Sequence, residues 1–353
     1  MQQTSAKVPS PRNQRKCKTF IQDAGFVRLL LITVGIFAVM SLLRPEQFFT
    51  IRNVRSMAFQ FPEFAILSLA VMLAMLTGGI DLSVVGAANL AAILAAILMR
   101  PLTSAGVNPI LVVSLGILVA LIVGVLAGLI NGVLIAKIGV PPILATLGTS
   151  QVFTGIGFGI TDGRAVLGLP AAYSVIGNGS LGVLPVPALI FIVLAVIVAV
   201  ILNRTPLGEK IYMLGTNPLA ARFAGLGNDW ILIRTYTICG VMASVAGLVM
   251  MSRANSAKAD FGASYLLLSV LIAVLGGTNP YGGFGKVAGV VLAVLSLQFL
   301  SSGFNILRIS NFAKEFVWGG LLLVVMVMSI VIIVRRRTPE GLKWRLGVRQ
   351  DRA

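Results

Sequence analysis

The chain has 353 residues, of which 57% are hydrophobic and 11% charged, and its mean hydropathy is +0.97. This composition excludes an ordinary soluble domain, in which about 25% of residues are charged, and it indicates an integral membrane protein. The chain contains no histidine, which excludes histidine-based acid–base catalysis, catalytic triads and histidine metal sites. We therefore expect a protein that is not an enzyme and that needs no metal or other cofactor.

The net charge of +17 is concentrated at the two ends of the chain, which argues against nucleic acid as a partner. We predict a basic tail at residues 1–22, expected to be disordered, a transmembrane domain at 23–334 and a second basic tail at 335–353. The positive-inside rule places both tails in the cytoplasm, although Arg44, Arg52 and Arg55 on the first outer loop count against it. Cys17 and Cys239 lie too far apart in this arrangement to form a disulfide.

Apolar runs, most of them about 20 residues long, recur along the whole chain and predict an all-α membrane protein of about ten spans, embedded in the lipid bilayer. Ten spans also return both tails to the same side. A stripe of small residues on the fourth span should let a neighbouring helix approach closely; it comprises Gly124, Ala127, Gly128 and Gly132. The predicted spans are 25–43, 64–76, 87–99, 109–135, a span that starts at 141–142, 188–202, 231–251, 265–275, 287–300 and 316–334.

The most informative feature is the break between the second and third spans, where Gly78 and Gly79 precede a carboxylate, Asp81. Glycines let the backbone leave helical geometry, and Asp81 or Ser83 can cap the restarted helix. A broken helix at membrane depth must be shielded by protein or line a water-filled cavity, and a carboxylate there indicates a functional site. The alternative is a tight cytoplasmic turn between two spans. We favour a capping role for Asp81 over a charge in a pathway because it lies directly after the glycines.

A similar break, Gly276-Gly277-Thr278-Asn279, separates the eighth and ninth spans. Paired glycine-interrupted segments in the two halves of a chain point to a translocation site, and the span count makes this pair parallel rather than inverted. The following Gly282-Gly283-Phe284-Gly285-Lys286 is not a phosphate-binding loop because Pro280 and Val287 occupy required positions of that motif. ATP hydrolysis would therefore need another chain.

Residues 203–229 form the one long polar segment in the middle of the chain. Its basic residues place it in the cytoplasm, and residues 218–224 should form a short helix on the membrane surface. A surface helix displayed on a loop is typical of a docking element, with an idle linker as the alternative.

Four segments together resemble the membrane permeases of monosaccharide ABC importers, the branch that takes up ribose, xylose, galactose and autoinducer-2. They are GGIDLSV (78–84), NGVLIAKIGVPPILATLGT (131–149), TPLGEKIYMLGTNPLAARFAG (205–225) and LGGTNPYGGFGKVAG (275–289). The resemblance implies an inner-membrane homodimer or heterodimer of ten-span subunits, a separate ABC ATPase in the cytoplasm and a periplasmic substrate-binding protein. The sugar itself is not indicated.

The resemblance places the ATPase contact on the polar loop and the transport pathway beside the glycine breaks. We expect the loop to act through Gly208, Gly215, Asn217, Ala221, Arg222 and Gly225, and the pathway to be bordered by Gly78, Gly79, Asp81, Ser83, Gly276, Gly277, Thr278 and Asn279. The alternative function is a proton- or ion-coupled secondary transporter that uses Asp81 or Glu63 as its coupling site.

Overall fold

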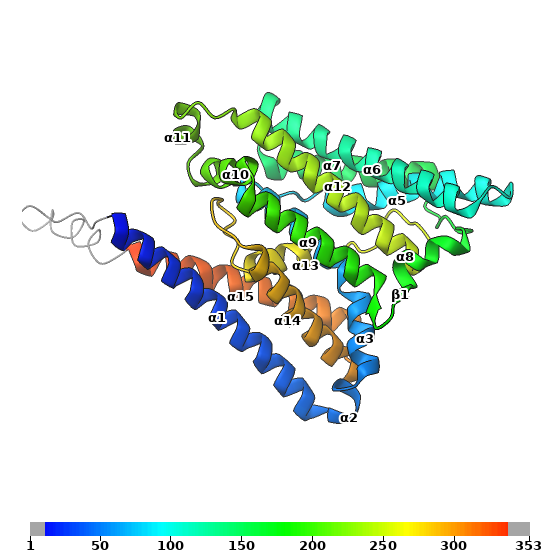
Figure 1. Ribbon diagram of the computed structural model, residues 1–353, viewed down its shortest axis with the longest axis horizontal. Helices are drawn as coiled ribbons and strands as arrows, with labels where there is room; N and C mark the ends of the chain where they lie inside the picture. Colours follow the sequence, from blue (N-terminus) through cyan, green and yellow to red (C-terminus); the bar gives the residue numbers. More distant parts are fainter. Residues whose placement is uncertain (1–10, 338–353) are drawn as a thin grey trace, which may run out of the picture.

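The computed structural model describes residues 11–337, so residues 1–10 of the first predicted tail and 338–353 of the second lie outside the described residues. Within the described part, the chain is a bundle of helices with one short antiparallel hairpin, β1 (Ser180–Leu181) and β2 (Leu184–Pro185) (Figure 1). This architecture confirms the predicted all-α membrane class.

The long helices follow one another through the whole bundle. They are α1 (Pro11–Leu43), α5 (Val84–Ser104), α6 (Pro109–Val133), α7 (Pro142–Thr161), α9 (Val186–Arg204), α12 (Asn228–Ala254), α14 (Val287–Ile306) and α15 (Asn311–Arg337). Shorter helices connect or interrupt them: α2 (Pro45–Phe48), α3 (Ile51–Gln60), α4 (Pro62–Leu76), the π-helical η1 (Leu134–Ile138), η2 (Ala171–Tyr173), α8 (Ser174–Asn178), α10 (Pro206–Thr216), α11 (Pro218–Phe223) and α13 (Tyr265–Leu275).

A helix lies at each of the ten predicted spans. Seven of the described helices are long and apolar enough to cross a membrane, and the bent pair α3 and α4, which meet at 45°, makes an eighth. The helices α13 and α15 occupy the two remaining predicted runs. The chain is thus a multi-pass membrane protein. One expectation fails: α1 begins at Pro11, so the disorder predicted for residues 1–22 does not extend over 11–22.

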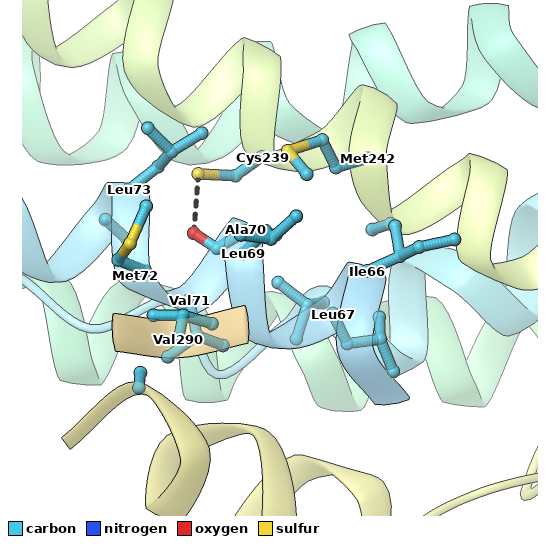
Figure 2. Close-up of a cluster of buried hydrophobic side chains, with 14 of the residues drawn as sticks. Ile66, Leu67, Leu69, Ala70, Val71, Met72, Leu73, Cys239, Met242 and Val290 are labelled. Atoms are coloured by element: carbon cyan, nitrogen blue, oxygen red, sulfur yellow. Dashed lines mark hydrogen bonds between the residues drawn. The ribbon is translucent and has the colours of Figure 1, made fainter. Parts of the chain in front are cut away.

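Helix α4 lies at the centre of the bundle. All of its residues are buried, which fits a helix that is apolar on every side. Figure 2 shows its side chains between α12, which contributes Cys239 and Met242, and α14, which contributes Val290. The Cys239 thiol donates to the Ala70 carbonyl at 3.2 Å. Cys239 is therefore a buried packing residue with a free thiol.

The predicted small-residue stripe on α6 does receive a neighbouring helix, α12. A Cβ atom added at Gly124 would lie 2.5 Å from the Gly240 carbonyl of α12, and one at Gly132 would lie 2.7 Å from Ile233 Cα. Gly128 is similarly closed off by the backbone of Tyr236. Close backbone approach through small residues is how membrane helices pack tightly.

The two ends of the bundle carry different connections (Figure 1). The short helices α10 and α11 lie at one end. The helices α2, α3 and α8 and the hairpin lie at the other, where Arg55 of α3 donates to Ser180 of β1 at 2.9 Å. The first glycine break and the loop after the second one also lie at the α10–α11 end, where both contact Gly215 of α10.

Candidate functional site

The first glycine break is a turn at the C-terminal end of α4. Gly78 adopts a left-handed conformation with φ of +88°, and its N–H donates to the Met75 carbonyl at 2.9 Å. The next residue, Gly79, is packed so closely that an added Cβ would lie 2.5 Å from the Tyr236 hydroxyl and 2.8 Å from Pro142 Cβ. The chain then continues without regular secondary structure to the start of α5 at Val84.

The second break repeats this geometry at the end of α13. Gly277 has φ of +85°, and its N–H donates to the Val274 carbonyl at 2.9 Å. Gly277 is thus the structural counterpart of Gly78, and the two glycine pairs correspond with a shift of one residue. Asn279 closes the following loop because its N–H donates to the Phe284 carbonyl at 2.8 Å and its amide donates to the Gly282 carbonyl at 3.0 Å.

The first break, the loop that follows the second break, and α10 meet in a cluster that we call the glycine junction, made of residues 76–78, 215–216 and 282–283. The Gly283 N–H donates to the Leu76 carbonyl at 3.0 Å. A Cβ atom on Gly215 would collide with that carbonyl and lie 2.5 Å from the Gly283 nitrogen, and one on Gly282 would lie 2.8 Å from the Gly78 nitrogen. Three distant segments of the chain therefore touch through backbone atoms.

A second contact ties α10 to the same loop. The Tyr212 hydroxyl donates to the Gly285 carbonyl at 2.8 Å, and burial raises the pKa of this tyrosine. Sequence analysis missed Leu76, Tyr212 and the role of Gly282-Gly283. The pair Gly282-Gly283 was the signal in the sequence that could have indicated this contact, since the phosphate-binding motif does not explain it.

Asp81 belongs to a buried polar network rather than to a helix cap. Its Oδ1 accepts from the Ser83 N–H at 2.9 Å and from the Ser83 hydroxyl at 2.6 Å. Asn131 of α6 donates to the Ser83 hydroxyl at 2.7 Å and accepts from Thr149 of α7 at 2.6 Å. The network joins α5, α6 and α7, and sequence analysis did not include Asn131 or Thr149 in it.

The capping prediction is therefore wrong as stated. Helix α5 begins at Val84, its N-cap is Ser83, and no side chain caps its first turn. Asp81 accepts the N–H of Ser83 itself, which lies before the helix. Asp81 and Ser83 are each 1% exposed. Gly78 and Gly277 do reach the surface.

The polar loop folds into α10 and α11, and the second of these confirms the predicted short helix. Asn217 caps α11 by accepting from the Leu219 and Ala220 N–H groups at 3.1 and 3.0 Å. Of the predicted contact residues, Gly208, Gly215 and Ala221 are buried supports, whereas Asn217, Arg222 and Gly225 are exposed.

This loop also exposes large apolar side chains that sequence analysis did not single out. Leu219 is 63% exposed and Phe223 84% exposed on α11, and Met213 of α10 is 50% exposed. Exposed apolar groups beside polar ones mark interaction surfaces. We call these three residues with Arg222 the α10–α11 face.

Glu63 lies at the opposite end of the bundle and is fully occupied. Its carboxylate pairs with Arg253 at 3.1 Å and accepts from the Tyr265 hydroxyl at 2.8 Å. With 3% of the residue exposed, Glu63 serves to join α4, α12 and α13.

Comparisons with known proteins agree with the helical membrane architecture. A family model described as "Branched-chain amino acid transport system / permease component" matches residues 53–328. The ribose import permease protein RbsC of Bacillus subtilis (strain 168) is 34% identical over 197 residues, which is 55% of this chain and 61% of that protein. No solved structure matches the chain.

Two relatives from other bacteria are named as autoinducer 2 import system permease protein LsrD. The protein of Yersinia enterocolitica is 32% identical over 217 residues, which is 60% of this chain and 66% of that relative. The protein of Klebsiella pneumoniae is 34% identical over 195 residues, or 54% and 59% of the two chains. The chain thus spans less than two thirds of the length of these relatives.

Proposed function

The chain belongs to the family of branched-chain amino acid transport system permease components, and we propose that it is the membrane permease subunit of an ATP-driven ABC importer. The names of its relatives favour a monosaccharide or a related furanosyl compound as substrate. The proposed setting is a bacterial inner membrane, with both termini and the α10–α11 face in the cytoplasm. The proposed partners are a separate ABC ATPase, a periplasmic substrate-binding protein and a second permease subunit, identical or different.

The observation that carries this proposal is the path from an exposed surface to the centre of the bundle. The ATPase would dock on the α10–α11 face, where Phe223 and Leu219 are exposed. Movement of α10 would then act on the end of α4 and on the loop between α13 and α14 through the glycine junction, since Gly215 touches Leu76 and Gly283 without an intervening side chain. Backbone contacts of this kind transmit a rigid-body shift because no rotamer can absorb the displacement.

The pathway itself is better placed along α7 than at the buried Asp81. Gly148, Gln151, Gly155 and Gly159 follow helical spacing on one side of α7, and all four are exposed. Beside each of these glycines, nothing lies within 4 Å of the position of an added Cβ. A polar Gln151 facing lipid would be costly, so this side of α7 suits an axis shared with the second subunit. In this arrangement the glycine breaks lie at the end of the pathway, where they transmit the movement of α10 to the helices of the bundle.

The ion-coupled alternative has weaker support. A coupling carboxylate has to exchange protons or ions with water, yet Glu63 is paired with Arg253 and Asp81 is buried. Uptake of labelled ribose and other pentoses by right-side-out vesicles loaded with ATP, with the ATPase co-expressed and the binding protein present outside, tests the choice. We expect uptake to stop on ATP depletion and to persist with a proton ionophore. The reverse pattern would establish the ion-coupled function instead.

A further inference from the structure

A cavity of about 520 Å³ opens between the first turn of α10 and the first turns of α12. Thr205 and Lys210 form one side of it, and Trp230, Ile231 and Arg234 form the other. It lies on the wall of the bundle and touches neither the glycine junction nor the network around Asp81. The transport mechanism proposed above therefore makes no use of it.

The charge of this cavity is purely positive. Lys210 and Arg234 are its only charged lining residues, and both are exposed. Among the residues that the structure describes, neither has a carboxylate within salt-bridge distance. The neighbouring Asp229 is already paired with Lys137 at 3.0 Å and does not line the cavity. Two cations with an open volume between them suit an anionic ligand.

The depth of the cavity indicates the ligand. Arg234 is the seventh residue of α12, a membrane-spanning helix, so it lies about 9 Å along the axis from the helix start. Because α12 has 27 residues and is longer than the hydrocarbon core of a bilayer, its first two turns fit the headgroup layer, where an exposed guanidinium can contact lipid phosphate. Trp230 precedes it by one turn on the same side and is 61% exposed, as is typical of aromatic residues at the membrane interface.

We propose that this cavity binds the phosphate headgroup of an anionic phospholipid from the leaflet at the α10–α11 end. Lys210 and Arg234 contact the phosphate, and Trp230 lies against the glycerol and the upper acyl chains. Basic pockets between membrane helices on the cytoplasmic side are suited to such headgroups. Because Lys210 belongs to α10 and Arg234 to α12, the bound lipid bridges the helix that bears the docking face and a fixed span. The proposal rests on the proposed function only for the assignment of this end to the cytoplasm.

Quenching of Trp230 fluorescence by brominated lipids tests the site. The full-length chain carrying Trp318→Phe and Trp344→Phe keeps Trp230 as its only tryptophan. It is reconstituted in vesicles that contain either brominated phosphatidylglycerol or brominated phosphatidylcholine. We expect the anionic lipid to be preferred at the site by roughly fivefold for each basic residue. Lys210→Gln with Arg234→Gln should abolish the preference, whereas Arg100→Gln, an exposed position at the other end of α5, should leave it intact.

Three further measurements separate lost charge from lost folding, a lipid from a soluble anion, and lipid binding from docking of the ATPase. Arg234→Lys with Lys210→Arg keeps both charges and should retain the preference, which distinguishes lost charge from lost folding. Inorganic phosphate at matched ionic strength should leave the lipid preference unchanged, and its removal by phosphate would assign the site to a soluble anion. An equal preference for both lipids in the parent, or an unchanged preference in the double Gln variant, would overturn the proposal. So would loss of ATPase assembly without loss of lipid preference in that variant, which would assign the two cations to protein docking.

Discussion

Gly215→Ala is the most informative perturbation of the glycine junction. The added Cβ would collide with the Leu76 carbonyl and lie 2.5 Å from the Gly283 nitrogen. Both atoms are backbone and are joined by a hydrogen bond of 3.0 Å, so neither can move without the other. The substitution therefore forces α10 away from the end of α4 and breaks the contact between Leu76 and Gly283.

The magnitude follows from the two consequences of that displacement. Overpacking a close-packed site costs about 1–3 kcal/mol. Leaving the Gly283 N–H or the Leu76 carbonyl unpaired in the interior costs about 1–3 kcal/mol more. We expect a loss of about 2–6 kcal/mol of stability at the junction. Transport should fall more than membrane abundance, because α10 loses its contact with the end of α4 and with the loop at Gly283.

The assay combines thermal unfolding of the purified chain with ATP-driven uptake in vesicles, corrected for the amount of permease in the membrane. Gly35→Ala is the matched control, since nothing lies within 4 Å of a Cβ added there in α1. The control should unfold at or slightly above the wild-type temperature, as expected for alanine in place of a helical glycine. The account of the junction is refuted if Gly215→Ala matches Gly35→Ala in both measurements.

Three other predictions concern separate parts of the chain. Phe223→Ser should weaken assembly with the ATPase without lowering the stability of the isolated permease, because Phe223 is 84% exposed. The control is Phe312→Ser on α15, where the side chain is 85% exposed. Equal assembly of the two variants would contradict the assignment of the α10–α11 face as the docking surface. Asp81→Asn should keep near wild-type thermal stability because its amide oxygen can still accept hydrogen bonds from Ser83. Asp81→Leu should lose about 1–3 kcal/mol of folding stability. Equal losses in the two variants would indicate a role for the charge of Asp81. Maleimide labelling of wild type should report Cys17 alone, since Cys239 is buried, and it should occur only from the cytoplasm; labelling from outside would reverse the proposed orientation.

The helical breaks illustrate how far local sequence can predict function. The pairs Gly78-Gly79 and Gly276-Gly277 correctly predicted the C-terminal ends of α4 and α13. Glycine readily adopts the left-handed conformation that Gly78 and Gly277 have in the structure. The glycine pattern did not reveal that the first break contacts the loop after the second one. The bond from the Gly283 N–H to the Leu76 carbonyl depends on where α13 lies beside α4. Contacts between segments some 200 residues apart leave no periodic signal.

Asp81 shows the same limit at the level of one side chain. Its position after two glycines predicted a hydrogen bond to a nearby backbone N–H, and it does accept the N–H of Ser83. The helix begins two residues later than a cap at Asp81 requires, and the hydroxyl of Ser83 accepts a hydrogen bond from Asn131 of α6. The role of the carboxylate was therefore decided by a partner from another helix.

The sequence by itself determined the class of the protein. Apolar runs of membrane length, basic termini and helix-ending glycines are local properties, so each can be recognised from the residues of its own segment. It also determined the order of the helices and the short helix α11. Only the tertiary structure decided which surfaces are available, since burial depends on neighbours. It enclosed Asp81, left Phe223 exposed, and placed Gly215 of the polar loop against the end of α4 and the loop between α13 and α14.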